Sequence, residues 1–122
     1  MKTEIKTFDE INQDMENYAR DDDNDRDIRL AVINWWAEFS EENFEICKEI
    51  ILNLNLVKNS NIPEDVKTNL KSIGEKINSK GGLPSLLSCY YIISNFMNVK
   101  KVIKDRLYII EMLWDGIGEW QH

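Results

Sequence analysis

The chain contains a single histidine, His122, and only two cysteines, Cys47 and Cys89. A structural zinc site needs about four nitrogen or sulfur ligands, so the sequence does not support one. Without an internal histidine, neither a Ser-His-Asp nor a Cys-His arrangement is available for nucleophilic catalysis. No pair of carboxylates stands out from the surface acids as an acid–base pair. We therefore expect no cofactor, no bound metal and no enzymatic activity.

Long apolar runs are also missing. No stretch approaches the roughly 18 apolar residues of a membrane span, and the N-terminal segment MKTEIKTFDE lacks the apolar region of a signal peptide. Two cysteines without a CxxC pair are typical of free buried thiols in a reducing compartment. The sequence thus predicts a cytoplasmic protein that does not contact a membrane.

Glycine and proline are scarce, at five and two residues, which favours long regular elements over frequent turns. The hydrophobic share of 43% and the charged share of 30% are near the globular average. The sequence predicts one helical domain over residues 1–122, with residues 1–6 as a flexible N-terminal arm. Its richness in Asn, Lys and Ile is typical of an AT-rich genome, such as that of a low-GC bacterium, its phage or a large DNA virus.

Apolar residues recur with the helical period along most of the chain, and no segment alternates with period two. The pattern predicts helices at about residues 8–20, 26–39, 41–56, 63–78, 84–98 and 102–114. Thr7 and Glu10 match a capping box at the first helix. Ser40 is expected to cap the third helix. Gly81 and Gly82 are expected to end the fourth.

Two of the predicted helices are apolar on most of their circumference, which is typical of buried elements. They are the helices over residues 26–39 and 84–98, and the second is the more apolar. Residues 63–78 instead carry one narrow apolar stripe, which is typical of a surface helix. The sequence predicts an all-α fold, a compact bundle of five or six helices with a central hydrophobic helix near residues 84–98.

Charge is unevenly distributed along the chain. The net charge is −7, and residues 8–27 alone contain nine acids and two bases. Such a chain does not bind nucleic acid directly through its overall field, because phosphate binding requires clustered Lys and Arg. It does not suit an anionic membrane surface either. The natural partner is another protein with a basic surface.

The aspartate-rich segment 21–27 is the main candidate contact. Its carboxylates repel one another and slightly oppose compaction, which favours a use outside folding. Carboxylates can also occupy the phosphate-binding groove of a nucleic-acid enzyme, because they present the same charge to the same Arg and Lys side chains. Trp120 is the tryptophan expected to be most exposed, and tryptophan is enriched at binding hot spots. The candidate partner-binding residues are Asp21, Asp22, Asp23, Asp25, Asp27 and Trp120.

Two charged clusters have alternative interpretations. Four aspartates occupy the first, third, fifth and seventh positions of an EF-hand-like loop: Asp21, Asp23, Asp25 and Asp27. Arg26 replaces the glycine that permits the sharp turn, and Val32 replaces the bidentate glutamate, so a solvated acidic loop is favoured over a calcium site. A basic cluster either binds an acidic or phosphate group or complements the end of the preceding helix, and we favour the second. It consists of Lys100, Lys101, Lys104 and Arg106.

These observations predict a non-enzymatic protein that acts by protein–protein interaction, of the inhibitor, immunity or adaptor type. The acidic face of residues 9–27 is its expected contact. The alternative is a structural or assembly subunit that self-associates into a homo-oligomer, such as a minor virion component. A stable homo-oligomer in light scattering would favour the alternative.

Overall fold

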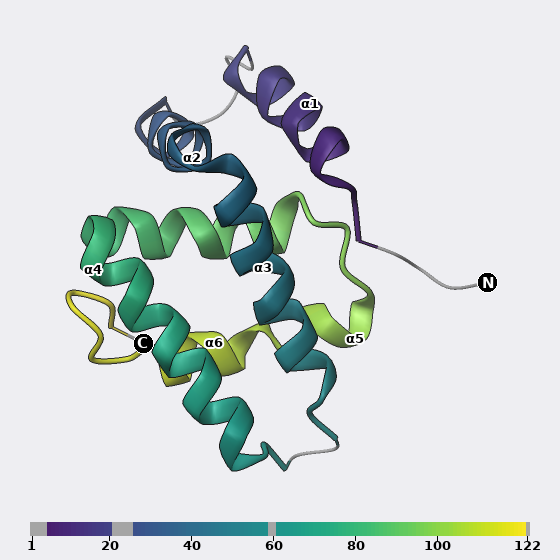
Figure 1. The fold of residues 1–122 in the computed structure, drawn as a ribbon, viewed down its shortest axis with the longest axis vertical. Helices are drawn as coiled ribbons and strands as arrows, with labels where there is room; N and C mark the ends of the chain where they lie inside the picture. The colour runs from purple at the N-terminus through teal and green to yellow at the C-terminus, as the bar shows by residue number, and fades with distance from the viewer. Residues whose placement is uncertain (1–4, 21–25, 59–60, 122) are drawn as a thin grey trace.

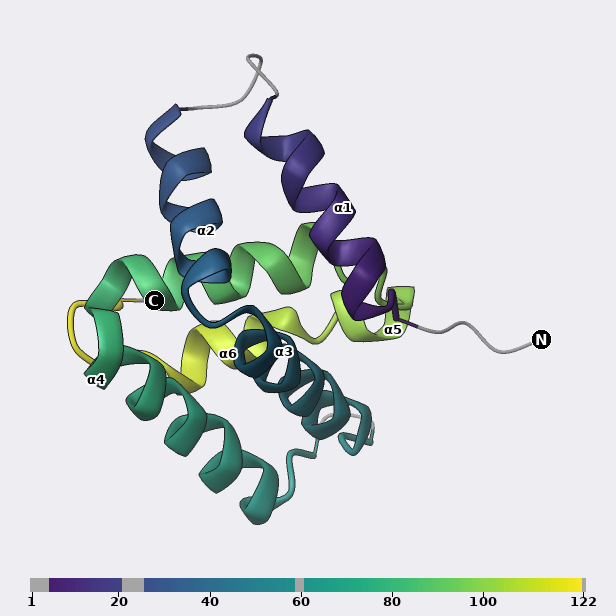
Figure 2. The same ribbon diagram turned by 45° about the horizontal axis from the view of Figure 1, so that its top comes forward.

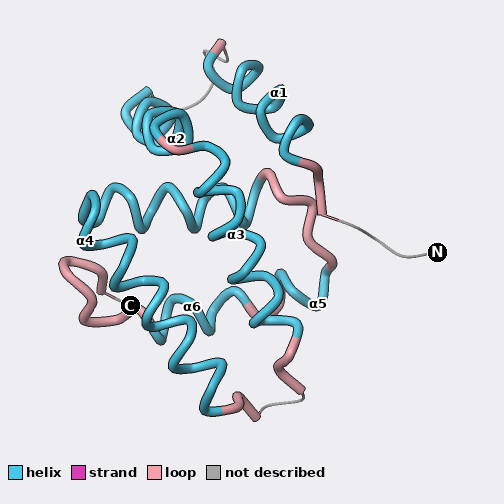
Figure 3. The backbone as a smooth tube through the Cα atoms, viewed as in Figure 1, coloured by secondary structure: helices cyan, strands magenta, loops and turns pink. Residues whose placement is uncertain are grey.

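The computed structural model describes residues 5–20, 26–58 and 61–121. They form α1 (Phe8–Ala19), α2 (Arg26–Glu38), α3 (Ser40–Asn55), α4 (Glu64–Asn95), α5 (Lys101–Lys104) and α6 (Leu107–Leu113). Apart from one isolated bridge between Lys58 and Asn61, the described residues have no β-pairing. The prediction of an all-α bundle is therefore confirmed (Figures 1 and 3). Within the described ranges, no helix is long and apolar enough to cross a bilayer.

The second half of α4 is the centre of the bundle. α4 bends at Gly82, where φ is 70° and ψ is −156°, and this bend is the break predicted at Gly81–Gly82. Beyond the bend, α4 runs across the molecule with α1 and α2 on one side and α5 and α6 on the other (Figures 1 and 2). Four of its side chains have no exposed surface: Leu86, Cys89, Ile92 and Ile93. The predicted central helix is confirmed, although it ends at Asn95.

The start of α1 follows the prediction. The Glu10 amide donates to the Thr7 hydroxyl at 3.2 Å, and the Thr7 amide donates to the Glu10 carboxylate at 2.8 Å. Upstream, the Lys6 amide donates to the Met97 carbonyl at 3.2 Å, so this part of the chain lies beside the end of α4. Residues 1–4 of the predicted arm lie outside the described residues.

The junction between α2 and α3 differs from the prediction. Ser40 is the first residue of α3, and the N-cap is Phe39, with φ of −143° and ψ of 65° and no side-chain capping bond. Instead, the Asn43 side chain donates to the Trp35 carbonyl near the end of α2 at 2.6 Å. The predicted capping role of Ser40 is therefore wrong. Only Phe39 separates α2 from α3, so Phe39 takes the N-cap position and Ser40 is already helical.

α2 lies on the surface rather than in the core. Its buried side chains are Val32 and Trp36, whereas Ile28 and Leu30 are 51% and 43% exposed. α2 packs against α1, α3 and α4, and these contacts leave part of its apolar circumference open. The prediction of a core helix over residues 26–39 is therefore wrong.

The last predicted helix, over residues 102–114, is divided into α5 and α6. Asp105 and Arg106 separate them while keeping right-handed backbone angles. The Arg106 guanidinium donates to the Leu54 carbonyl at 2.9 Å and so connects this junction to the end of α3. Because the backbone stays right-handed across the junction, the buried side chains of α5 and α6 form one continuous stripe. It consists of Ile103, Leu107, Ile110 and Trp114.

Candidate functional site

An open cleft of about 550 Å³ lies between α2 and the second half of α4. Its walls are mostly apolar and include Ile28, Ala31, Val32, Pro84, Leu87, Tyr90 and Tyr91. The lining positions recur at three- and four-residue intervals on each helix, so each helix presents one stripe to the cleft. The volume falls within the range of pockets that bind ligands.

The cleft exposes apolar surface on both walls. Ile28 on α2 and Leu87 on α4 are each 51% exposed. A single exposed apolar side chain is ordinary, but here two large ones border the same hollow. Asp27 is the only charged side chain among the described residues that line it. The cleft therefore combines apolar walls with one negative charge, at the N-terminal end of α2.

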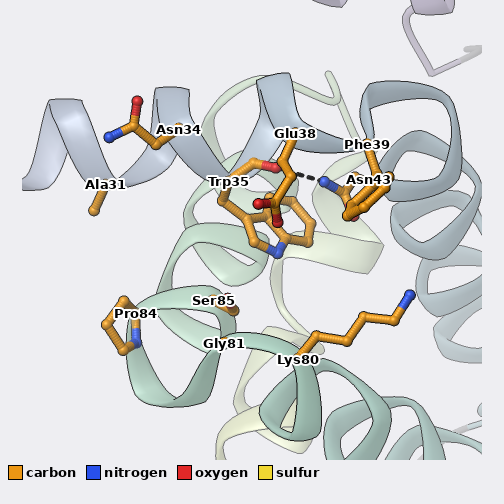
Figure 4. Close-up of a pocket in the computed structure, with 10 residues that line it drawn as sticks. All are labelled: Ala31, Asn34, Trp35, Glu38, Phe39, Asn43, Lys80, Gly81, Pro84 and Ser85. Carbon is orange, nitrogen blue, oxygen red and sulfur yellow. Dashed lines mark hydrogen bonds between the residues drawn. The ribbon is translucent and has the colours of Figure 1, made fainter.

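A second hollow, of about 320 Å³, lies at the bend of α4 (Figure 4). It shares Ala31 and Pro84 with the cleft. The half-buried Trp35 ring points toward α4, and the Trp35 carbonyl is held by the Asn43 amide (Figure 4). The two hollows are therefore neighbours along α2.

The opening of the second hollow carries both signs of charge. Lys80 forms an ion pair with Glu42, and its ammonium lies 5.8 Å from the centre of the Phe39 ring. The hydrogen bond and the charge of Lys80 lower the pKa of Glu42. Lys80 therefore has two partners at this hollow.

Among the predicted contact residues, Asp27 is at the cleft. It is exposed and lies in the first turn of α2, where a negative charge is favourable beside the helix dipole. The remaining predicted aspartates lie outside the described residues: Asp21, Asp22, Asp23 and Asp25. One end of the acidic segment, Asp27, therefore lies at an apolar cleft that the sequence analysis did not predict.

Trp120 is buried, with 6% of its surface exposed. Its ring packs edge-on against Trp114 at 5.2 Å and against Tyr90 at 5.9 Å between ring centroids. Its indole N–H donates to the Glu111 carbonyl at 3.2 Å. The Gly116 amide donates a hydrogen bond to the Trp120 carbonyl, and this bond closes the C-terminal turn. The expectation that Trp120 is exposed is wrong, and we remove it from the candidate contact surface.

Sequence reasoning missed the exposure of Ile28 and Leu87. It assigned both to the apolar patterns of core helices, because periodicity alone does not separate a buried face from an open one. A usable signal was present: two helices of this small chain are apolar around most of their circumference. Such a helix needs packing partners on nearly every side. A bundle of this size cannot surround both the helix over residues 26–39 and the helix over residues 84–98.

The described residues provide no metal centre. No group of three or more His, Cys, Asp or Glu side chains among them is arranged to hold a metal ion. Of the four EF-hand-like positions, Asp27 alone is described, and it is part of α2. The calcium interpretation therefore gains no support from the described part of the loop.

The two cysteines pack against each other between α3 and α4. Their sulfur atoms are 3.9 Å apart, and both side chains are fully buried. Burial, followed by the hydrogen bond with Cys47, raises the pKa of the Cys89 thiol well above its ordinary value. Because the thiolate is the nucleophile, Cys89 is a poor one. The pair is a packing element of the core.

Comparison with protein-family models, with curated proteins and with solved structures finds no match to this chain. Its function is therefore inferred from its own geometry. The cleft between α2 and α4 is the candidate site, because it joins exposed apolar surface to the Asp27 carboxylate in the first turn of α2.

Proposed function

We propose that the chain is a non-enzymatic protein-binding module of the inhibitor, immunity or adaptor type. Its cleft between α2 and α4 receives an apolar segment of a partner whose surroundings are basic. The single observation that carries this proposal is the cleft itself, with Ile28 and Leu87 half-exposed over it and Asp27 on its lining. An apolar hollow with one charged group is suited to anchoring a side chain and fixing its orientation.

The apolar and acidic parts contribute differently to binding. Completing the burial of a half-exposed leucine contributes on the order of 1 kcal/mol, and a partner side chain in the cleft gains a similar amount. The acidic segment 21–27, at the start of α2, acts mainly by steering a basic partner, which raises the association rate. Loss of the apolar contact should therefore speed dissociation, whereas loss of the charges should slow association.

The alternative prediction, a self-associating structural subunit, can use the same cleft. It differs in the occupant, which would be a second copy of this chain.

Binding tests need a purified partner, obtained by capture on the full chain. Replacing Asp21, Asp23 and Asp25 with asparagine should lower the association rate on the order of tenfold at low salt. A matched control removes three exposed charges elsewhere, through Glu41→Gln, Glu75→Gln and Glu119→Gln. This control should change the rate little.

Leu87→Asp tests the cleft itself. Leu87 is 51% exposed, so the change should leave the fold intact, as circular dichroism can verify. The variant should dissociate faster from the captured partner, by at least about tenfold, since it places a charge in the apolar contact. If the leucine variant and the asparagine variant both bind with wild-type rates, the proposed contact surface is wrong.

A further inference from the structure

The two cysteines of the chain meet in the core of the bundle. Cys47 belongs to α3 and Cys89 to the second half of α4, and these helices pack against each other. The two sulfur atoms are 3.9 Å apart, although the residues are 42 positions apart in the sequence. Neither side chain has exposed surface. The fold therefore holds two thiols in contact, and the chain contains no third cysteine that could compete for either.

A disulfide between these thiols requires only a small movement. A sulfur–sulfur bond is about 2.0 Å long, so the two atoms must approach each other by about 2 Å. Rotation of a cysteine side chain between staggered positions moves its sulfur by on the order of 3 Å. The approach is therefore within the reach of side-chain rotation.

A disulfide also suits the apolar surroundings of the pair. It is neutral and has no hydrogen-bond donor, so it leaves no polar group unsatisfied in the core. A soft metal ion would instead need two thiolates. Burial, followed by the hydrogen bond with Cys47, raises the pKa of the Cys89 thiol, and this opposes a buried thiolate. Oxidation to a neutral disulfide is the chemistry that the site favours.

We propose that Cys47 and Cys89 form an internal disulfide when the chain folds in an oxidising medium and remain two thiols when it folds in a reducing one. The oxidant is a small disulfide of the glutathione class. The thiolate of one cysteine attacks it, forms a mixed disulfide and displaces one small thiolate. The thiolate of the other cysteine attacks the protein sulfur of the mixed disulfide, and the second small thiolate leaves. Two protein thiols thus lose two electrons and two protons, and one small disulfide becomes two thiols.

Burial determines when this exchange takes place. Exchange needs a thiolate and access for the small disulfide, and the native fold withholds both, since the two side chains are fully buried. Both are available during folding, before α3 packs against α4. Closure should therefore be fast during folding and slow in the native chain. The pair then records the redox conditions under which the chain folded.

The bridge should stabilise the fold. It closes a loop that contains the end of α3, the first half of α4 and the bend at Gly82, and so it restricts the unfolded chain. For a loop of 42 positions, the midpoint of urea unfolding should rise by at least about 1 M. Neither cysteine lines the cleft between α2 and α4, so this inference does not depend on the proposed function.

Refolding of the full-length chain from urea tests the inference. One sample refolds with oxidised glutathione and the other with reduced glutathione, and free thiols are then blocked in denaturant and counted by mass spectrometry. The oxidised sample should be a monomer without free thiols, with the peptides of Cys47 and Cys89 linked, and its urea midpoint should be at least about 1 M higher. Oxidised glutathione added to the native reduced chain should close the bridge at least about tenfold more slowly. The double variant Cys47→Ala/Cys89→Ala is the control, and its midpoint should be the same after both treatments.

Four results would overturn the inference. The first is an oxidised sample that contains only mixed disulfides with glutathione or dimers linked between chains. The second is a bridged chain whose midpoint rises by less than about 1 M, because the native packing would then resist the bridge. The third is equal closure rates in the native and the refolding chain, and the fourth is an equal midpoint shift in the double variant. None of these measurements involves a partner, so their failure would leave the proposed function standing, and failure of partner binding would leave the bridge standing.

Discussion

Replacing Gly74 with alanine should destabilise the protein, even though alanine is the better helix former. Gly74 is buried in the first half of α4, and an added Cβ would lie 2.5 Å from the Trp114 Nε1 and 2.6 Å from its Cδ1. Carbon atoms in contact normally stay about 3.5–4.0 Å apart, so the indole would have to withdraw by about 1 Å. It is poorly placed to do so, because Trp114 is fully buried and its N–H donates to the Leu70 carbonyl at 2.9 Å.

The expected magnitude follows from opposing contributions. Overpacking a core costs about 1–3 kcal/mol, and weakening the buried indole hydrogen bond adds up to about 1 kcal/mol. Replacing an interior helical glycine with alanine gains about 1 kcal/mol. We therefore expect Gly74→Ala to lower the free energy of unfolding by about 2 kcal/mol. Trp114 accounts for most of the cost, because the next neighbour of the added Cβ, the Ile117 Cδ1, lies farther away, at 3.0 Å.

Urea unfolding followed by far-ultraviolet circular dichroism measures this change. Ser72→Ala, at an exposed site in the same half of α4, is the propensity control and should change stability by less than about 0.5 kcal/mol. In a Trp114→Leu background, Gly74→Ala should become neutral or stabilising, which gives a coupling energy on the order of 2 kcal/mol. Equal stability of the Gly74 and Ser72 variants would refute the packing described for Trp114.

Other expected outcomes concern the core, the thiols and one tyrosine. Ile92→Ala should cost about 2–5 kcal/mol in the same unfolding assay, and a loss under about 1 kcal/mol would contradict the central position of α4. Cys47 and Cys89 should react with an aromatic disulfide reagent far more slowly in the native than in the unfolded chain, because both are buried; equal rates would contradict this. Burial and, to a lesser extent, the hydrogen bond to Glu111 raise the pKa of Tyr90 to about 12. The folded chain therefore keeps a proton that the unfolded chain loses near pH ~10, so stability should fall as pH rises from about 10 through about 12. Tyr90→Phe should show a shallower fall in urea unfolding over that range, and identical profiles would count against the assignment.

Features set by neighbouring residues were predictable from the sequence. The capping box of Thr7 and Glu10 needs only residues three positions apart, and it forms as expected. The bend at Gly82 follows from a residue that adopts positive φ at little cost. The central helix was predictable because its apolar residues cover nearly every face, which leaves no side suited to solvent.

Features that depend on distant packing were not predictable. Ser40 has a side chain suited to an N-cap. The start of α3 is instead set by the junction between α2 and α3, where the Asn43 side chain donates to the Trp35 carbonyl. Trp120 was expected to be the most exposed tryptophan, yet a ring contact with Trp114 holds it inside. The cleft requires α2 and α4 to pack so that Ile28 and Leu87 remain uncovered, and no local pattern specifies that arrangement.

The two walls of the cleft belong to chain segments far apart in the sequence, residues 27–32 and 84–95. The cleft therefore exists only while α2 is docked on α4. Any occupant that binds the docked form and not the unfolded chain must stabilise the whole fold by mass action, by about 2.7 kcal/mol at a hundredfold excess over its dissociation constant. Thermal stability thus becomes a readout of occupancy, and undocking of α2 becomes a route by which an occupant is released.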